Sequence, residues 1–537
     1  MKRDGRDLTA ALADPGFTPS VRHVAELVAL AADEVHGEAV ERALARLEGA
    51  LAAAVAPHVA GAASRARVHV YRALGRTASS APDVLALAIA GLADADERPR
   101  RAAATALGKL ALPAAAKSEA EAALLARWER AETDSERRVI AEALSRHGGE
   151  RAAAVLAGWT TNDVVLKKAV AKARLVLDRE ARRESHGGVR GDVAPARPLP
   201  VVFFVRRGLE HFVVDELGAG DWHASIVGPG RVRATLHGAL ATAFVSRCAE
   251  RFAIALPDVT LGPREALDDA LVRALVDAEP IVAPLTEGAA RFRIAWAKGG
   301  HKRAVVWSIA EKIAAASRVF TNDPSSSLWE LSVDERRAKG GEAILGLTLA
   351  PRGLPDPRFA YRQKDVPAAS HPTLAAALAH AAGANADDVV WDPFVGSGLE
   401  LVERAKLGPY VALSGSDLEE SALEVARMNL HAAGVQAALV RADALTHFPR
   451  GTNLIVTNPP MGRRVRREGG GIGDFLADFV THAARKLPPG GRLVWLSSQW
   501  AATRDAAKHA GFSVDGAATV DMGGFEAELQ IMTRRAR

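Results

Sequence analysis

The sequence predicts a multidomain protein with three consecutive regions: an all-α repeat region, a central α+β region and a C-terminal doubly wound α/β region. A helical phrase recurs before residue 183, strands and helices mix after Val201, and short apolar strands with glycine or acidic turns follow Ala386. A chain of 537 residues also exceeds what one hydrophobic core usually organises. We expect domains at 1–183, 201–365 and 366–537, with a linker at 184–200.

Composition and charge exclude several classes of protein. The chain is 48% hydrophobic and 25% charged, which is typical of folded domains. Its only cysteine, Cys248, excludes an internal disulfide and a cysteine-rich metal site, and we expect it to be buried. The acidic N-terminal turns and the absence of a long apolar run predict a cytoplasmic protein without a membrane partner. A net charge of +5 suits a polyanionic partner.

The first region repeats one amphipathic helical phrase. Its copies align at Leu74, Leu107 and Leu144, spaced by 33 and 37 residues, which is the length of a helix-turn-helix unit. The phrase DADERPRRAAATALGKL resembles a HEAT repeat, so we expect a HEAT-like solenoid at 1–183. A scaffold that binds a protein partner is the modest inference. The arginines of the repeats more often form a solvated helix face than a nucleic-acid surface.

The central region alternates strand and helix signals. VVFFV, RVRATL, RFRIAWA and AILGLTLA are predicted strands, whereas GLEHFVVDEL and the stretch from Gly238 to Ala253 are predicted helices. A compact basic turn made by Lys298, His301, Lys302 and Arg303 leads into another helix. Such a turn suits phosphate contacts, although an exposed loop is an equal alternative on the residues alone.

The third region opens with the strand and glycine turn of a nucleotide-binding unit. Gly396 and Gly398 let the backbone turn sharply, and Asp392 ends the preceding strand. Asp417 follows the next strand and can accept both hydroxyls of a ribose, while Asp443 ends a third strand and could accept an adenine amine. Each acid taken singly would more often be a helix N-cap.

The fourth strand carries the most specific signal, TNLIVTNPPMG. An amino nitrogen on an aromatic ring is a poor nucleophile because its lone pair is delocalised. The side-chain oxygen of Asn458 and the carbonyl of Pro459 can each accept one N–H, which holds that lone pair toward an electrophile. Pro459 and Pro460 stiffen the carbonyl's direction. Alone, Asn-Pro-Pro would be a simple turn.

These phrases resemble class I, amino-directed methyltransferases with a Rossmann-like fold. DPFVGSG, GSD, RAD and NPPMG match the cofactor loop, ribose acid, adenine contact and catalytic motif of that class. The resemblance implies S-adenosyl-L-methionine as cofactor and no metal. It also implies catalytic residues Asn458, Pro459, Pro460 and Met461, and cofactor-binding residues Asp392, Phe394, Gly396, Gly398, Asp417, Leu418, Asp443, Ala444 and Asn458.

From residue 200 onward the chain is most similar to THUMP-containing RNA methyltransferases of the guanine-N2 group. The supporting phrases include FFVRRGLEHFVVDEL, LWELSVDE and GLPDPRFAYRQKDVPAASHPTLAAAL. The resemblance implies a central THUMP-like module that binds structured RNA, with tRNA favoured over rRNA. Met461 departs from the family pattern, because an aromatic residue that stacks on the flipped base usually stands there.

A cluster of arginines follows the catalytic motif. Arg463, Arg464, Arg466 and Arg467 lie on a glycine-bounded stretch that could hold the phosphates beside a flipped nucleotide; a solubilising loop is the alternative. The leading hypothesis is therefore methylation of guanine N2 in tRNA or rRNA. N6-adenine methylation is the first alternative, since Asn-Pro-Pro serves either amine. A catalytically weak RNA-binding or scaffold protein is the second.

Overall fold

The computed structural model describes residues 7–14, 16–77, 81–184, 187–218, 220–262, 264–300, 302–338, 341–367, 369–462 and 471–536. The chain divides into two compact units. The first comprises Met1–His186 and Ala304–Asp323, and the second comprises Gly187–Arg303 and Pro324–Arg537.

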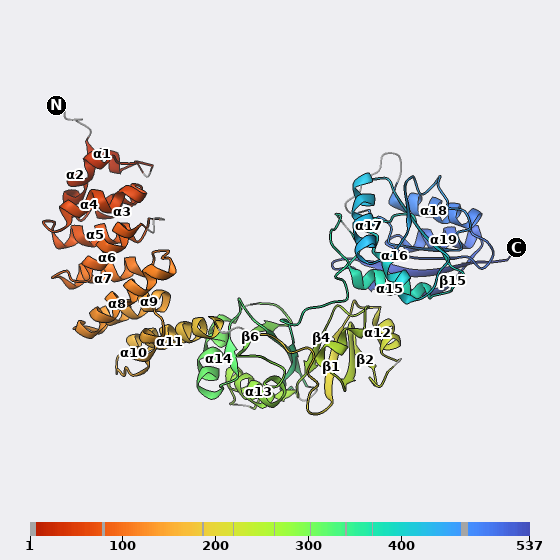
Figure 1. Ribbon diagram of the computed structural model, residues 1–537, viewed down its shortest axis with the longest axis horizontal. Coiled ribbons are helices and arrows are strands. Elements are labelled where there is room, and N and C mark those ends of the chain that lie inside the picture. Colours follow the sequence, from red (N-terminus) through yellow and green to blue (C-terminus); the bar gives the residue numbers. More distant parts are fainter. Residues whose placement is uncertain are drawn as a thin grey trace. The chain divides into compact units, whose positions relative to one another are not determined.

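The N-terminal part of the first unit is entirely helical, as predicted (Figure 1). Odd-numbered helices from α3 to α11 pack on one another in succession, and even-numbered helices from α2 to α8 form a second row. One continuous core of small and aliphatic side chains runs between the rows. The helices are α1 (Leu8–Leu12), α2 (Val24–Leu30), α3 (Gly37–Ala45), α4 (Leu51–Val59), α5 (Ser64–Leu74), α6 (Pro82–Gly91), α7 (Glu97–Leu107), α8 (Ala114–Arg130), α9 (Asp134–His147), α10 (Glu150–Ala157) and α11 (Val164–Glu184), with short 3-10 turns η1 (Val21–His23) and η2 (Glu48–Ala50). The same unit includes most of α14 (Arg303–Ala316) and β7 (Phe320–Asn322).

The second unit contains two sheets, and the first of them lies in the central region. Its strands run in the order β2-β3-β1-β4-β9-β8-β6, with β5 paired to β9. Neighbours are antiparallel except β6 and β8, which are parallel. The elements are β1 (Leu199–Phe204), α12 (Glu210–Leu217), β2 (Ser225–Gly228), β3 (Arg231–Leu236), η3 (Leu240–Val245), β4 (Arg251–Ala255), β5 (Val259–Thr260), α13 (Leu267–Val282), β6 (Ala290–Trp296), β8 (Trp329–Arg337) and β9 (Ala343–Ala350).

The helix expected over residues 238–253 was a wrong prediction. The segment forms the short turn η3 and then strand β4, whose last four residues are buried. Phe252 pairs with Phe203 of β1, and Ile254 pairs with both Val201 of β1 and Leu349 of β9. A short apolar run is compatible with either a buried helix or a buried strand. Here the pairing with β1 and β9 stabilises the strand.

The C-terminal domain is a Rossmann-like α/β sheet, as the sequence predicted. Its order is β12-β11-β10-β13-β14-β16-β15; strands β10 to β14 are parallel, and β16 is antiparallel to both of its neighbours. The elements are α15 (Pro372–Ala382), β10 (Val389–Asp392), α16 (Leu399–Leu407), β11 (Ala412–Asp417), α17 (Glu420–Ala432), β12 (Ala438–Arg441), β13 (Leu454–Thr457), α18 (Ile472–Lys486), β14 (Arg492–Ser497), α19 (Trp500–Ala510), β15 (Phe512–Asp521) and β16 (Glu526–Arg534).

Aromatic side chains fix α18 against this sheet. Phe479 of α18 packs between Trp391 of β10 and Trp495 of β14, with ring centroids 6.1 Å and 5.7 Å away. All three side chains are fully buried. This packing holds the central strands rigidly, which is what a site built at their ends requires. Among the described residues, no helix is long and apolar enough to cross a membrane.

Candidate active site at the strand ends

The motif residues meet at one edge of the second sheet. Asp392, Asp417 and Asn458 end or directly follow the parallel strands β10, β11 and β13. Strand β10 lies between β11 and β13, so the chain reverses its direction of travel across the sheet at this position. Ligands of open α/β sheets bind outside the carboxyl ends of the strands at such a switch point.

The glycine loop after β10 adopts the turn that its sequence predicted. Gly396 and Gly398 have φ values of +48° and +79°, a region that residues with a Cβ rarely enter. Gly398 is also the N-cap of α16, so the positive end of that helix lies beside the loop. The amide of Gly396 donates to Asp417 Oδ2 over 3.0 Å, which ties the loop to the end of β11.

Asp392 is a buried carboxyl whose two oxygens have different surroundings. Its Oδ1 accepts from Thr457 Oγ1 at 2.6 Å and from the Phe394 amide at 3.1 Å, whereas Oδ2 is buried and makes no hydrogen bond to any residue that the structure describes. Burial raises the pKa of Asp392 well above its usual range, and the nearby carboxyl of Glu400 raises it further. A buried acceptor of this kind suits a cationic or hydrogen-bonding ligand group.

The two acids expected to contact a nucleoside lie at the end of β11 and just beyond the end of the neighbouring strand β12. Asp417 is half-buried and accepts from one backbone amide on each oxygen, Gly396 on Oδ2 and Glu419 on Oδ1. Asp443 does not end its strand as expected, because β12 finishes at Arg441 and Asp443 lies in the following turn. There its Oδ1 accepts from the Leu445 amide at 2.9 Å, which rigidifies that turn.

The apolar residues that the motifs place near the cofactor have different surroundings. Leu418, next to Asp417, is 54% exposed, as single apolar side chains on a protein surface often are. Ala444 is buried, and Phe394 is half-buried with its ring 5.8 Å from that of Phe475 and 5.4 Å from that of Phe479.

Asn458 follows β13 with its amide held in one orientation. Its Nδ2 donates to Ser370 Oγ at 2.9 Å, whereas its Oδ1 is buried and meets no partner in the described ranges. Pro459 is buried, and Pro460 and Met461 are half-buried. The carbonyl of Met461 accepts from Ser498 Oγ at 3.3 Å, which anchors the end of the motif. The side-chain acceptor that the sequence singled out therefore has no hydrogen-bond partner among the residues that the structure describes.

Sequence reasoning missed the two residues behind Asn458. Ser370, just before α15, accepts the Asn458 amide and donates its hydroxyl to Glu400 Oε1 at the start of α16. Both side chains are buried. One signal in the sequence could have indicated a buried polar contact. The charged Glu400 stands between the apolar Leu399 and Leu401 in the first turn of the helix that follows the glycine loop.

The expected RNA-binding residues are only partly covered by the structure. Lys298 and Arg303 are exposed, while Lys302 pairs with Glu335 and lies 4.7 Å from the ring centre of Trp296. His301 and the four arginines Arg463, Arg464, Arg466 and Arg467 lie outside the described residues.

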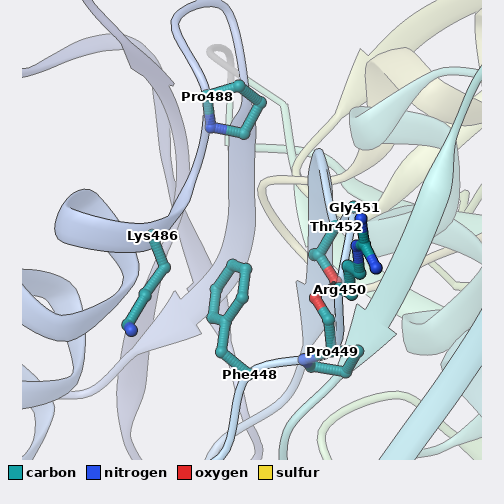
Figure 2. A pocket seen from close by; sticks show the side chains of 7 residues that line it. All are labelled: Phe448, Pro449, Arg450, Gly451, Thr452, Lys486 and Pro488. Carbon is teal, nitrogen blue, oxygen red and sulfur yellow. Dashed lines mark hydrogen bonds between the residues drawn. The ribbon is translucent and has the colours of Figure 1, made fainter.

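A separate hollow lies at the opposite edge of the same sheet (Figure 2). Thr452 precedes β13, and Lys486 ends α18, so the hollow is near the amino ends of the parallel strands. It holds none of the motif residues. Its lining residues are Phe448, Pro449, Arg450, Gly451, Thr452, Lys486 and Pro488.

Comparison with known proteins gives a coherent set of relatives. A family model described as "RMKL-like, methyltransferase domain" matches residues 360–527. The chain is 31% identical over 131 residues to U6 snRNA (guanine-N(2))-methyltransferase THUMPD2 of Bos taurus, covering 24% of this chain and 25% of that protein. It is 30% identical over 129 residues to tRNA (guanine(10)-N2)-dimethyltransferase of Methanothermobacter thermautotrophicus, covering 24% of this chain and 38% of that protein.

A solved structure extends the likeness to the central region. The crystal structure of TrmN from Thermus thermophilus matches with a TM-score of 0.51 and 30% identity, covering 63% of this chain and 99% of that one. By contrast, the chain spans about a quarter of the length of the bovine relative and 38% of the archaeal one.

The sheet order, the glycine loop and the Asn-Pro-Pro turn define a class I methyltransferase fold. With the relatives above, the chain belongs to the THUMP-containing class I RNA methyltransferases.

Proposed function

We propose that the chain is an S-adenosyl-L-methionine-dependent RNA methyltransferase that modifies an exocyclic base amine, with guanine N2 of tRNA as the preferred target. The observation that carries the proposal is the buried Oδ1 of Asn458, which has no partner among the described residues and follows β13, the strand paired with β10. The names of the relatives, which are guanine-N2 enzymes acting on tRNA or U6 snRNA, support the choice of base.

The residues at the strand ends fit the proposed cofactor. Gly396 and Gly398 leave room for close backbone approach, Asp417 retains acceptor capacity for ribose hydroxyls, and Asp392 offers an unpartnered oxygen. Phe394, Leu418, Asp443 and Ala444 would complete the contacts to the nucleoside. When bound, the cofactor supplies an electrophilic methyl group.

The chain's own part in the reaction is to hold the nucleophile. Asn458 Oδ1 and the carbonyl of Pro459 would each accept one N–H of the amine, which directs the nitrogen lone pair away from the ring. Two acceptors also stabilise the positive charge that develops on the nitrogen as the new bond forms. Pro460 would stiffen this turn, and Met461 would cover the base with a polarizable thioether in place of an aromatic ring.

The helical and central regions would recruit a partner and the RNA substrate. The two-row helical stack at 1–183 would be a HEAT-like solenoid that binds a protein partner. The central sheet at 201–365 would be the THUMP-like module that holds structured RNA, with Lys298, His301, Lys302 and Arg303 on phosphates. Arg463, Arg464, Arg466 and Arg467 would hold phosphates beside the flipped nucleotide.

The proposal is tested by transfer of a tritiated methyl group to total RNA, followed by digestion to nucleosides. Labelled N2-methylguanosine supports it, whereas labelled N6-methyladenosine would assign the same site to adenine. Asp417→Ala is the control, because loss of the ribose acceptor should remove the label. A parent protein that binds the cofactor and RNA but labels no nucleoside would be a scaffold, the alternative that Met461 favours.

A further inference from the structure

Three side chains form a buried hydrogen-bonded chain behind the catalytic motif. Asn458 Nδ2 donates to Ser370 Oγ at 2.9 Å, and Ser370 donates its hydroxyl to Glu400 Oε1. Ser370 is 8% exposed and Glu400 is 4% exposed. The three residues come from the end of β13, the segment before α15 and the first turn of α16, so only the folded domain brings them together.

The donor and acceptor capacities of these three side chains determine which group donates in each of the two hydrogen bonds. A serine hydroxyl has one proton to donate, and here Glu400 accepts it, which leaves Ser370 Oγ only lone pairs for its second partner. Ser370 must then face the NH2 end of the Asn458 amide rather than its oxygen. The amide cannot turn over without placing two acceptors against each other.

The other polar atom of the Asn458 amide, Oδ1, is the acceptor proposed to bind the target amine. Asn458 Oδ1 is buried and has no partner in the described part of the chain. A buried oxygen without a hydrogen bond is costly, so a free amide would rotate to relieve it. The contact with Ser370 prevents that rotation and keeps the oxygen available to a ligand N–H.

We propose that Ser370 and Glu400 are positioning residues that hold the Asn458 amide with its oxygen presented to the target amine. The inference rests on the proposed function, since it takes a base amine as the group that Asn458 accepts from. Neither residue touches the substrate; each acts through Asn458. Glu400 contributes because it accepts the hydroxyl proton of Ser370. Without Glu400, Ser370 could donate that proton to Asn458 Oδ1.

Glu400 also lies close to the acid of the cofactor loop. Besides burial, the carboxyl of Glu400 raises the pKa of Asp392, while burial raises the pKa of Glu400 and the hydrogen bond from the Ser370 hydroxyl lowers it. In Glu400→Gln an amide replaces the carboxyl, and its NH2 can donate to Ser370. The Ser370 proton is then free to turn toward Asn458 Oδ1, which predicts a partial loss of orientation.

The kinetic test compares Ser370→Ala, Ser370→Thr and Glu400→Gln in the full chain, with total RNA as substrate. We expect Ser370→Ala to lower kcat by about 10- to 100-fold, with the KM for RNA and the cofactor Kd within about threefold of the parent. Ser370→Thr, which keeps the hydroxyl, should restore most of kcat, and Glu400→Gln should fall between them. Ser513→Ala, which removes a hydroxyl from β15, is the matched control. Unchanged kcat in Ser370→Ala, or an equal loss in Ser370→Thr, would overturn the proposal.

A second readout does not depend on activity. The chain has six asparagines, so selective 15N-amide labelling gives six side-chain NH2 pairs, and Asn458→Ala identifies the pair of interest. We expect that pair to move in Ser370→Ala and Glu400→Gln but to stay near its parent position in Ser370→Thr. An unmoved pair in Ser370→Ala would contradict the inference. If the parent methylates no RNA, the proposed function fails while this measurement still decides whether Ser370 holds the amide. If Ser370→Ala unfolds, Glu400→Gln carries both readouts.

Discussion

Two buried oxygens define the site at the scale of single residues. Within the described part of the chain, Asp392 Oδ2 and Asn458 Oδ1 are both buried without a hydrogen-bond partner, and they lie at the ends of the paired strands β10 and β13. Each unpaired buried polar atom costs about 1–3 kcal/mol. A bound ligand that donates hydrogen bonds to these two oxygens would remove this destabilisation, and local destabilisation of the free protein is common at binding sites.

The buried acid Asp392 should make the ligand-free protein less stable as pH rises. Its pKa is raised in the folded state by burial and by Glu400 and Asp417, so folding favours the protonated form. The stabilising contribution is complete below the ordinary value of 3.8 and is lost as pH rises through the folded-state pKa. We predict that the melting temperature of Asp392→Asn changes less than that of the parent between about pH 5 and about pH 8. If the melting temperatures of the parent and of Asp392→Asn changed equally with pH, Asp392 would not contribute to the pH dependence of stability.

Among the secondary-structure elements, the N-terminal helices repeat one arginine contact. Arg67, Arg100 and Arg137 stand seven residues before the buried Leu74, Leu107 and Leu144. Each arginine donates to backbone carbonyl oxygens just ahead of its own helix, those of Ala62, of Asp94 and Ala95, and of Ala131 respectively. Arg67 and Arg100 also bind an acid of the next repeat, so the contact joins successive helix pairs.

Glu136 is the most buried acid of this network and should be essential to it. It is 1% exposed and accepts from both Arg100 and Arg127. Glu136→Ala would leave two arginines without their shared partner, so we predict a loss of about 3–5 kcal/mol in the unfolding free energy of the helical region. Glu142→Ala, which removes an exposed acid of the same helix, should cost less than about 1 kcal/mol. Urea unfolding followed by circular dichroism measures both, and equal losses would contradict the account.

Local signals explain which elements were predictable from the sequence. The strand, glycine turn and helix around Gly396 and Gly398 were found because their signals lie within a few adjacent residues. Strand β4 was missed because its pairing with β1 and β9 involves residues far apart in sequence. Contact between Ser370, Glu400 and Asn458 was missed for the same reason, since no local pattern reports which buried groups face each other.

In the second unit as a whole, a buried contact joins the central region to the methyltransferase domain. Arg247, which precedes β4, donates to both oxygens of Glu403 in α16, and Tyr361 donates to the same carboxylate at 2.5 Å. Since α16 follows the glycine loop, the central region is connected directly to the helix that positions the candidate cofactor site. Arg247 and Tyr361 are far from Glu403 in the sequence, so only the fold reveals this contact.

RNA binding by the whole molecule should depend on the exposed cations of the basic turn. Lys298 and Arg303 are exposed, whereas Lys302 is engaged with Glu335 and Trp296. We predict that replacing Lys298 and Arg303 by alanine weakens RNA binding and reduces the slope of log K against log salt by about 1–2. Arg273→Ala, which removes a cation from an exposed ion pair, should leave the slope unchanged. Filter binding across a salt series measures this, and an unaltered slope in the double variant would remove the turn from the RNA surface.

The most direct test of the central claim is to measure single-turnover methyl transfer and cofactor affinity in Asn458→Ala. The account predicts that the transfer rate falls by about 10²–10³-fold or more, because one of two acceptors for the amine is lost. It also predicts that the cofactor Kd from calorimetry stays close to that of the parent, because Asp392, Asp417 and the glycine loop are untouched. A variant that transfers methyl groups at the parent rate would show that Asn458 does not hold the amine.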